Sequence, residues 1–463
     1  MSDTPSPSSA ARAPDEMLAM LRLATPLASA NLLQMAVGAV DVMFVARLGD
    51  RPLAASTLAV SLFLLMMWCF WGISGAVAPV VAAELGARAH AVREVRRSVR
   101  MALWLGLALG LIGMAITTRF DLIMAATGQQ PEVAALAASF AQVIKWSMVP
   151  MVVSSVLRSV VAALGRPAYA TVITVLSLLS NICGNYALVF GHWGAPALGL
   201  NGAALATVIT SVVTLLAYLA VLRLDRRLRR YRLLGRWWRP EWARLWQMLR
   251  LGAPIGLIVL AEGGLFNSAA FLMGRIGVTA LAGHAVAIQI AALAFQVPFG
   301  VGQAATIRVG YHFGAGDAVA IGKAGRAAML VGLGFACLNA LVMIAAPRLV
   351  ISAYVDAMAP ANAALVALAI GYLRIAAGFQ LADAVQTIAA GSLRGLQDTA
   401  MPAAIAIAGY WLAGFVTALW LGLYTPLAGV GVWVGLLVGL VVVAVLLARR
   451  WQRRGALGLL PRQ

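Results

Sequence analysis

The chain contains few charged residues. Only 11% of its 463 residues are Asp, Glu, Lys or Arg, whereas 62% are hydrophobic, and the mean hydropathy is +0.90. A soluble protein of this length cannot bury so much apolar surface, but a chain that crosses a bilayer many times requires it. The composition excludes a soluble globular protein and predicts a membrane protein.

Residues that bind metals or form catalytic centres are also scarce. The three cysteines, Cys69, Cys183 and Cys337, fall inside apolar stretches and share no ligand-like spacing. We interpret them as small buried hydrophobic residues, neither disulfide partners nor metal ligands. The four histidines are scattered, and the chain has no H-E-x-x-H motif and no phosphate-binding loop. These absences argue against an intramembrane enzyme and against an ATP-driven pump.

Long apolar stretches recur along the chain, and several exceed the ~20 residues that cross a bilayer. Their approximate limits are 17–41, 53–83, 101–118, 133–157, 168–190, 202–222, 247–274, 280–307, 327–346, 361–391, 402–423 and 427–448. We therefore expect an all-α polytopic membrane protein with twelve transmembrane helices. The first 16 residues are polar, and no cleavable signal peptide is expected.

The two halves of the chain resemble one another at one constant offset. The tetrapeptide MLRL at 20–23 returns at 248–251, and Pro26 returns as Pro254. Further pairs at this offset, which we call repeat mates, are Arg47 and Arg275, Gly49 and Gly277, Gly72 and Gly300, and Gly86 and Gly314. Six spans in each half make the repeat parallel, related by an axis along the membrane normal. We expect two six-helix lobes, related by a pseudo-twofold axis, around a central cavity.

The basic residues lie between the apolar stretches. The net charge is +19, and the arginines concentrate in 88–100, in 223–244 and after 448. The positive-inside rule places both termini and the central loop in the cytoplasm. Because these charges have a topological explanation, no nucleic-acid partner is expected. The predicted divisions are an N-terminal tail (1–16), an N-lobe (17–222), a basic linker (223–246), a C-lobe (247–448) and a basic tail (449–463).

The linker also carries tryptophans, including Trp237, Trp238 and Trp242. Two interpretations stay open. The segment lies at the membrane interface with its arginines on lipid phosphate, or it is a solvated connector.

Three carboxylates fall inside the predicted spans: Asp41, Glu262 and Asp383. A carboxyl group in a low-dielectric medium resists ionisation, so it either exchanges a proton or holds a cation. A site that cannot hold two positive charges at once has the chemistry of an antiporter. The alternative is a structural ion pair with an intramembrane cation, for which the candidates are Lys145 and Arg374.

Polar residues accompany these acids. Asn181 and Asn185 are four residues apart on one helical face, and with Thr207 they are placed to surround Asp41. The remaining supporting candidates are Gln34, Asn267, Gln289, Gln296 and Gln303. Gln34 is the repeat mate of Glu262, and the last three are spaced by seven, so they form one stripe. The alternative for each is interhelical hydrogen bonding that serves packing.

Methionine and aromatic residues crowd the second apolar stretch, where Met66, Trp68 and Trp71 occur close together. Such side chains suit an adaptable pocket for flat apolar ligands, but for any one of them ordinary core or lipid contact is the simpler interpretation.

With these features the chain resembles the MATE family of multidrug and toxic-compound extrusion transporters, in its NorM-like bacterial branch. The strings that carry the resemblance are ATPLASANLLQMAVGAVDVMFVARLG, GAPIGLIVLAEGGLFNSAAFLMGRIG and LADAVQTIAAGSLRGLQDTAMP, which contain Asp41, Glu262 and Asp383 in turn. The resemblance implies an N-lobe ion site at Asp41 with Asn181 and Asn185, and a C-lobe site at Glu262 and Asp383.

The chain departs from the family at two places. Glu84, whose repeat mate is His312, stands where glutamine is frequent in the family. Phe379, one turn before Asp383, replaces a tyrosine of some relatives; it is a further candidate for the substrate cavity, without a hydroxyl.

The resemblance implies export of cationic lipophilic drugs by alternating access, in exchange for H⁺ or Na⁺. We expect a monomer without other cofactors, and no metal apart from Na⁺ at Asp41 or at Glu262 and Asp383. The alternative within the superfamily is a flippase for lipid-linked substrates, which would need an arginine-rich cavity for pyrophosphate.

Overall fold

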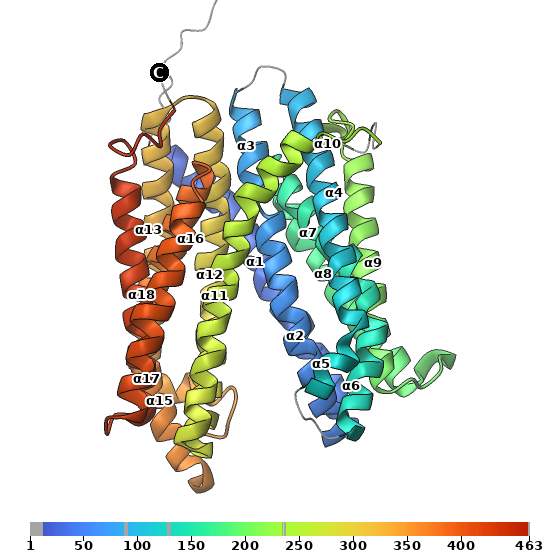
Figure 1. The fold of residues 1–463 in the computed structure, drawn as a ribbon, viewed down its shortest axis with the longest axis vertical. Coiled ribbons are helices and arrows are strands. Elements are labelled where there is room, and N and C mark those ends of the chain that lie inside the picture. The colour runs from blue at the N-terminus through green and yellow to red at the C-terminus, as the bar shows by residue number, and fades with distance from the viewer. Residues whose placement is uncertain (1–12, 88–90, 127–130, 234, 236–237, 462–463) are drawn as a thin grey trace, which may run out of the picture.

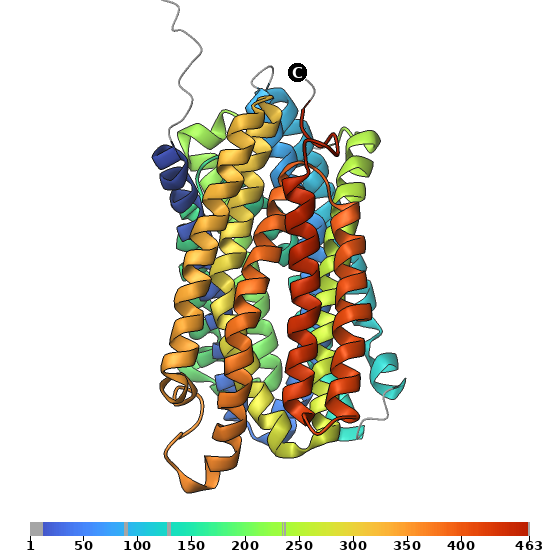
Figure 2. The same ribbon diagram turned by 90° about the vertical axis from the view of Figure 1, so that its left-hand side faces the viewer.

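The computed structural model describes residues 13–87, 91–126, 131–233, 235 and 238–461. Within these residues all regular structure is helical, and twelve helical segments are long and apolar enough to cross a membrane. The predicted fold class is therefore confirmed. The first described residues and the C-terminal end lie at the same end of the bundle, the upper end in Figures 1 and 2. We call it the basic end, because the described arginines of the linker and of the C-terminal tail lie there.

The first six spans form the N-lobe. They are α1 (Ala13–Ala46), α2 (Asp50–Ser74) with α3 (Val77–Ala87), α4 (Ala91–Thr118), α6 (Pro131–Ile144) with α7 (Met148–Ala163), α8 (Ala168–Phe190) and α9 (Leu200–Leu224). The C-lobe spans are α11 (Trp242–Ile276), α12 (Val278–Gly314), α13 (Ala318–Ala345), α15 (Ala363–Gly395), α16 (Ala400–Ala408) with α17 (Val416–Leu423), and α18 (Ala428–Gln452). Short helices α5 (Phe120–Ala126), α10 (Arg226–Arg229) and α14 (Pro347–Ile351) connect them. The exact lobe limits stay a prediction.

Three predicted spans are not single helices. The second divides after Ser74, and the fourth passes through a 3₁₀ turn at Lys145–Ser147. Pro79 and Pro150 lie in the first turn after each division, where a missing backbone N–H costs no hydrogen bond. The eleventh span contains a π-helical segment, Gly409–Phe415.

The repeat is visible where the lobes cross. Gly72 on α2 meets Gly256 on α11, and a Cβ added to Gly72 would lie 3.0 Å from the Gly256 Cα. Their repeat mates form the equivalent crossing: Gly300 on α12 meets Ala28 on α1, where an added Cβ would lie 2.7 Å from the Cα. Small residues let the backbones approach closely at both crossings. From the first crossing, α2 and α11 diverge toward the lower end of Figure 1.

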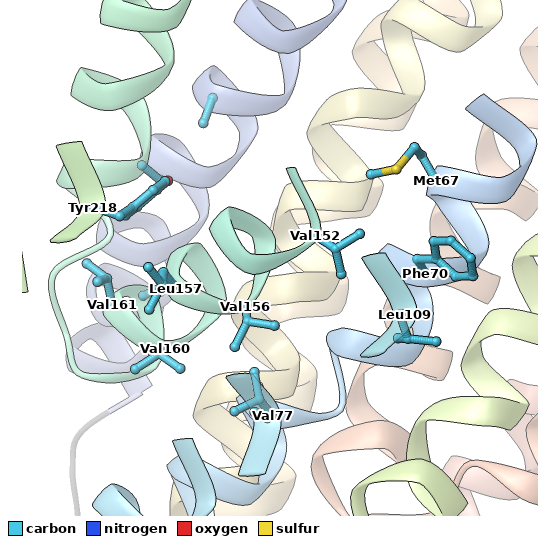
Figure 3. Packing of buried hydrophobic residues seen from close by; sticks show 14 of the residues in the cluster. Met67, Phe70, Val77, Leu109, Val152, Val156, Leu157, Val160, Val161 and Tyr218 are labelled. Atoms are coloured by element: carbon cyan, nitrogen blue, oxygen red, sulfur yellow. The ribbon is translucent and has the colours of Figure 1, made fainter. Parts of the chain in front are cut away.

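Two apolar clusters form the core, one centred in the N-lobe and one in the C-lobe. In the N-lobe, α7 lies at the centre and turns Val152, Val156 and Val160 toward Val77 of α3 and Leu109 of α4 (Figure 3). In the C-lobe the fully buried Trp433 of α18 stacks on Tyr372 of α15, with ring centroids 6.0 Å apart. The first cluster also contains C-lobe residues such as Val301, Ala304 and Ile388, so the two lobes pack against one another through apolar contacts.

The structure differs from the prediction for two of the cysteines, and it describes only part of the predicted tail and linker. Cys183 and Cys337 are exposed on the outer surfaces of α8 and α13, so they are not buried as predicted; all three cysteines are free thiols. The outer surface of a membrane helix is itself apolar, which explains why small hydrophobic residues occur there. Trp238 and Trp242 of the linker are exposed. The tail residues 1–12 and Trp237 lie outside the described part of the chain.

Candidate functional site

Asp41 forms the centre of a polar cluster in the N-lobe. Its carboxylate Oδ1 accepts hydrogen bonds from Asn181 Nδ2 at 2.9 Å and from Asn185 Nδ2 at 2.8 Å. Its other oxygen accepts one from Thr207 Oγ1 at 3.4 Å. Both asparagines are fully buried on α8, and Thr207 is on α9. The structure therefore assembles the four residues that the sequence grouped.

The chemistry of this cluster suits an ionisable carboxylate. Three donors compensate the negative charge of Asp41 without neutralising it. The asparagine side chains also carry carbonyl oxygens, which can turn toward a cation. Asn185 Oδ1 is buried and accepts no hydrogen bond among the described residues, so one such oxygen is available.

A second cluster lies in the C-lobe, where Glu262 of α11 and Asp383 of α15 share one amide. Gln386 Nε2 donates to Glu262 Oε1 at 3.2 Å and to Asp383 Oδ1 at 3.0 Å. The Gln386 oxygen accepts from the Tyr410 hydroxyl at 2.5 Å. Asp383, Gln386 and Tyr410 are all buried. The hydroxyl fixes which end of the amide faces the two acids.

Neither carboxylate of this second cluster forms a salt bridge within the described residues. Arg374 points to the outer surface of α15, and Lys145 donates to Gln142 in the N-lobe. The structural ion pair considered from the sequence is therefore not formed with either candidate. Two acids around a single amide carry more negative charge than their neighbours compensate, so the pair is suited to bind a proton or a cation.

The other polar candidates are not hydrogen-bonded to any of the three acids in the described structure. Asn267 and Gln296 bond to carbonyls of their own helices, at 2.8 and 3.1 Å. Gln289 is exposed, and the Gln303 oxygen is buried without a partner among the described residues. Gln34 is partly buried on α1. Their role in transport stays a prediction.

The four cavity candidates divide between the lobes. Met66 lines a small apolar pocket with Phe63, Ile116 and Phe120, and Trp71 packs beside the N-lobe core. Trp68 is 44% exposed. Phe379 is buried between Phe266 and Trp433, with centroid distances of 5.8 and 6.0 Å. They do not form one cluster in this structure, and their contact with substrate stays a prediction.

Two residues of the C-lobe cluster, Gln386 and Tyr410, and one intramembrane cation outside both clusters, Arg158, were not predicted from the sequence. Gln386 lies three residues after Asp383 on one helix, a spacing that marks a shared face. Tyr410 reaches the acids from the π-helical segment, which no sequence pattern indicated. Arg158 on α7 hydrogen-bonds Asn31 on α1 and is an intramembrane cation of the N-lobe, overlooked in favour of Lys145 and Arg374.

Comparisons with known proteins agree on one family. The family model MatE matches residues 26–187 and 254–420, two segments that begin at the repeat mates Pro26 and Pro254. The chain is 42% identical over 449 residues to a "probable multidrug resistance protein NorM" of Mesorhizobium japonicum, covering 96% of each chain. It is 40% identical over 438 residues to a protein with the same name from Brucella suis, covering 95% of this chain and 93% of that one.

Solved structures show the same fold. A multidrug resistance MATE family transporter in an outward-facing conformation superposes with a TM-score of 0.86 at 21% identity, covering 96% of this chain and 97% of that one. A eukaryotic MATE transporter gives 0.81 at 20% identity, covering 96% and 99%.

The family match and the named relatives define a multi-pass membrane transporter and not an enzyme. The chain belongs to the MATE family of multidrug transporters, and its similar curated relatives are NorM proteins.

Proposed function

We propose that this protein is a secondary active antiporter that exports cationic lipophilic compounds in exchange for H⁺ or Na⁺. The observation that carries the proposal is the Glu262–Gln386–Asp383 arrangement, in which two acids inside membrane helices share one amide donor and no basic side chain. The names of the relatives support multidrug substrates.

The coupling follows from charge balance. With the ion site empty, the acids are the main negative charge of the C-lobe interior and attract a cationic drug. When a proton or Na⁺ enters, that charge is compensated and the attraction is lost, so the drug leaves. Ion and drug thus exclude one another, as exchange requires.

Asp41 offers a second ion site in the N-lobe. Its three donors stabilise the carboxylate, while the free oxygen of Asn185 provides a ligand for a bound cation. Two sites in two lobes allow the ion and the drug to bind in different lobes and to be coupled through lobe movement.

The remaining features of the proposal concern location. We place the protein in the bacterial inner membrane as a monomer, with the basic end in the cytoplasm, because arginines are retained on that side. No cofactor other than the coupling ion takes part.

The test is uptake of a cationic dye into proteoliposomes under an imposed pH gradient or an imposed Na⁺ gradient. The wild type should respond to one of these gradients. Glu262→Gln or Asp383→Asn should reduce the rate by at least roughly tenfold. Glu132→Gln is the control, because Glu132 pairs with Arg51 at 2.7 Å on the exposed surface. If Asp41→Asn, Glu262→Gln and Asp383→Asn all transport like the wild type, the proposal fails.

A further inference from the structure

The start of α1 is bound to the opposite lobe by a buried ion pair. Glu16 is only 2% exposed, and its carboxylate accepts hydrogen bonds from Arg308 of α12 at 2.9 Å and 2.5 Å. His312, one turn further along α12, lies 3.6 Å from the same carboxylate. The contact joins the N-lobe to the C-lobe at the basic end.

The start of α11 is bound in the same way in the reverse direction. Arg244 of the C-lobe donates to Glu84 of α3 at 2.9 Å and to Ser98 of α4 at 2.7 Å. It also forms an ion pair with Glu94 of α4. Here a cation of α11 meets anions of the N-lobe, and beside it Glu241, directly before α11, pairs with Arg97 and Arg100 of α4.

The two contacts are related by the internal repeat. Glu16 and Arg244 are repeat mates, and so are Glu84 and His312. The acid Glu16 corresponds to the base Arg244, and the acid Glu84 corresponds to His312 beside Arg308, so each contact joins an acid to a base although its polarity is reversed. The internal repeat thus yields the same physical interaction twice from different residues.

The backbones of the lobes touch at the same level. A Cβ on Gly86 would overlap the Tyr311 carbonyl, and one on Gly314 would overlap the Ala83 carbonyl. Each glycine lies two residues beyond Glu84 or His312. Separation of the lobes at the basic end therefore requires both contacts to break, together with the ion pairs of Glu241 with Arg97 and Arg100.

We propose that Glu16 with Arg308 and His312, and Arg244 with Glu84 and Glu94, are positioning residues of the transport cycle. They form a twofold clasp that holds the basic end closed, and both halves of the clasp must open before that end admits substrate. Only the statement that the opened end admits substrate rests on the proposed antiport. The statement that the clasp holds the basic end closed depends only on the contacts between the two lobes.

The clasp is testable by distance measurement between spin labels in nanodiscs, without drug or gradient. In a background in which Cys69, Cys183 and Cys337 are replaced by alanine, Arg93→Cys and Val319→Cys place labels on exposed residues at the starts of α4 and α13. Glu132→Cys and Tyr424→Cys report on the opposite end.

We expect one short basic-end distance in the wild type. Glu16→Gln and Arg244→Gln should each increase the share of longer distances, on the order of tenfold, and the double variant should increase it further. The distance between the two labels at the opposite end should shorten as the basic end opens. Glu16→Arg combined with Arg308→Glu should restore the short distance, because the pair is rebuilt with reversed charges.

Asp398→Asn is the matched control. It removes a pair with Arg450 at 2.6 Å, at the same end but within the C-lobe. It should leave the distances unchanged. A folded Glu16→Gln/Arg244→Gln variant with wild-type distances would overturn the clasp, as would failure of the charge-reversed pair to restore them. The distance measurement does not depend on transport. If the distances change as expected but the protein does not export dye, the proposed function is refuted and the clasp is not.

Discussion

Gly86 of α3 packs against the backbone of Tyr311 of α12 so closely that no Cβ fits between them. The same contact recurs at Gly314 and Ala83 through the repeat. The lobes thus meet through two backbone contacts that only glycine permits, and this relationship leads to the first prediction.

Gly314→Ala should destabilise the protein by about 1–3 kcal/mol, because the added methyl group forces the lobes apart. The measurement is the thermal unfolding midpoint in detergent. Gly334→Ala is the control, since nothing lies within 4 Å of its added Cβ on α13. Equal midpoints for the two variants would contradict the role of the close contact.

Tyr410→Phe should lower the rate of dye export by roughly tenfold with a smaller effect on KM. The hydroxyl orients Gln386, and without it the amide is free to turn its oxygen toward Glu262 and Asp383. Initial rates over a range of dye concentrations measure the effect. Tyr424→Phe, on an exposed tyrosine, should behave as the wild type; a wild-type rate for Tyr410→Phe would remove the tyrosine from the site.

Asn185→Ala should impair transport more than Thr207→Val. Asn185 donates to Asp41 at 2.8 Å, whereas Thr207 donates at 3.4 Å. The Asn185→Ala variant therefore loses the stronger hydrogen bond, worth about 1–3 kcal/mol. Asn201→Ala serves as control, since Asn201 bonds Ser139 on the exposed surface. Export rates that rank the variants in the opposite order would disprove this arrangement around Asp41.

The stability that Glu241 contributes should depend on pH only under acidic conditions. Burial raises its pKa, but the hydrogen bond and charge of Arg97 and the charges of Arg100 and Arg244 outweigh this, so the pKa lies below its usual value. A lowered carboxylate pKa gives stability that is complete above the unfolded value of about 4.3 and is lost as pH falls through the folded value.

The difference in unfolding midpoint between the wild type and Glu241→Gln should therefore be constant from neutral pH to about pH 5 and should shrink below about pH 4. A difference that already declines between pH 7 and 6 would show that another group controls this contact.

Residues close together in the sequence were predicted best. Asn181 and Asn185 share a face because they are four apart, and the family resemblance implied that they lie beside Asp41. The partner of Glu262 and Asp383 was not predicted, because choosing between Gln386 and Arg374 requires knowing which side of α15 faces inward, and excluding Lys145 requires knowing that it lies in the other lobe. The candidates for the substrate cavity lie in different lobes because Phe379 belongs to the second half of the chain, far in sequence from Met66, Trp68 and Trp71.

The sequence by itself determined that the chain crosses the membrane twelve times and that it consists of two related halves, because apolar length and a fixed repeat are properties of linear order. Only the tertiary structure decided that Glu16 reaches Arg308 and that Arg244 reaches Glu84, and that one amide bridges Glu262 and Asp383. These contacts join residues that are far apart along the chain. Their formation depends on how the helices cross and rotate against one another, which hydropathy alone does not specify.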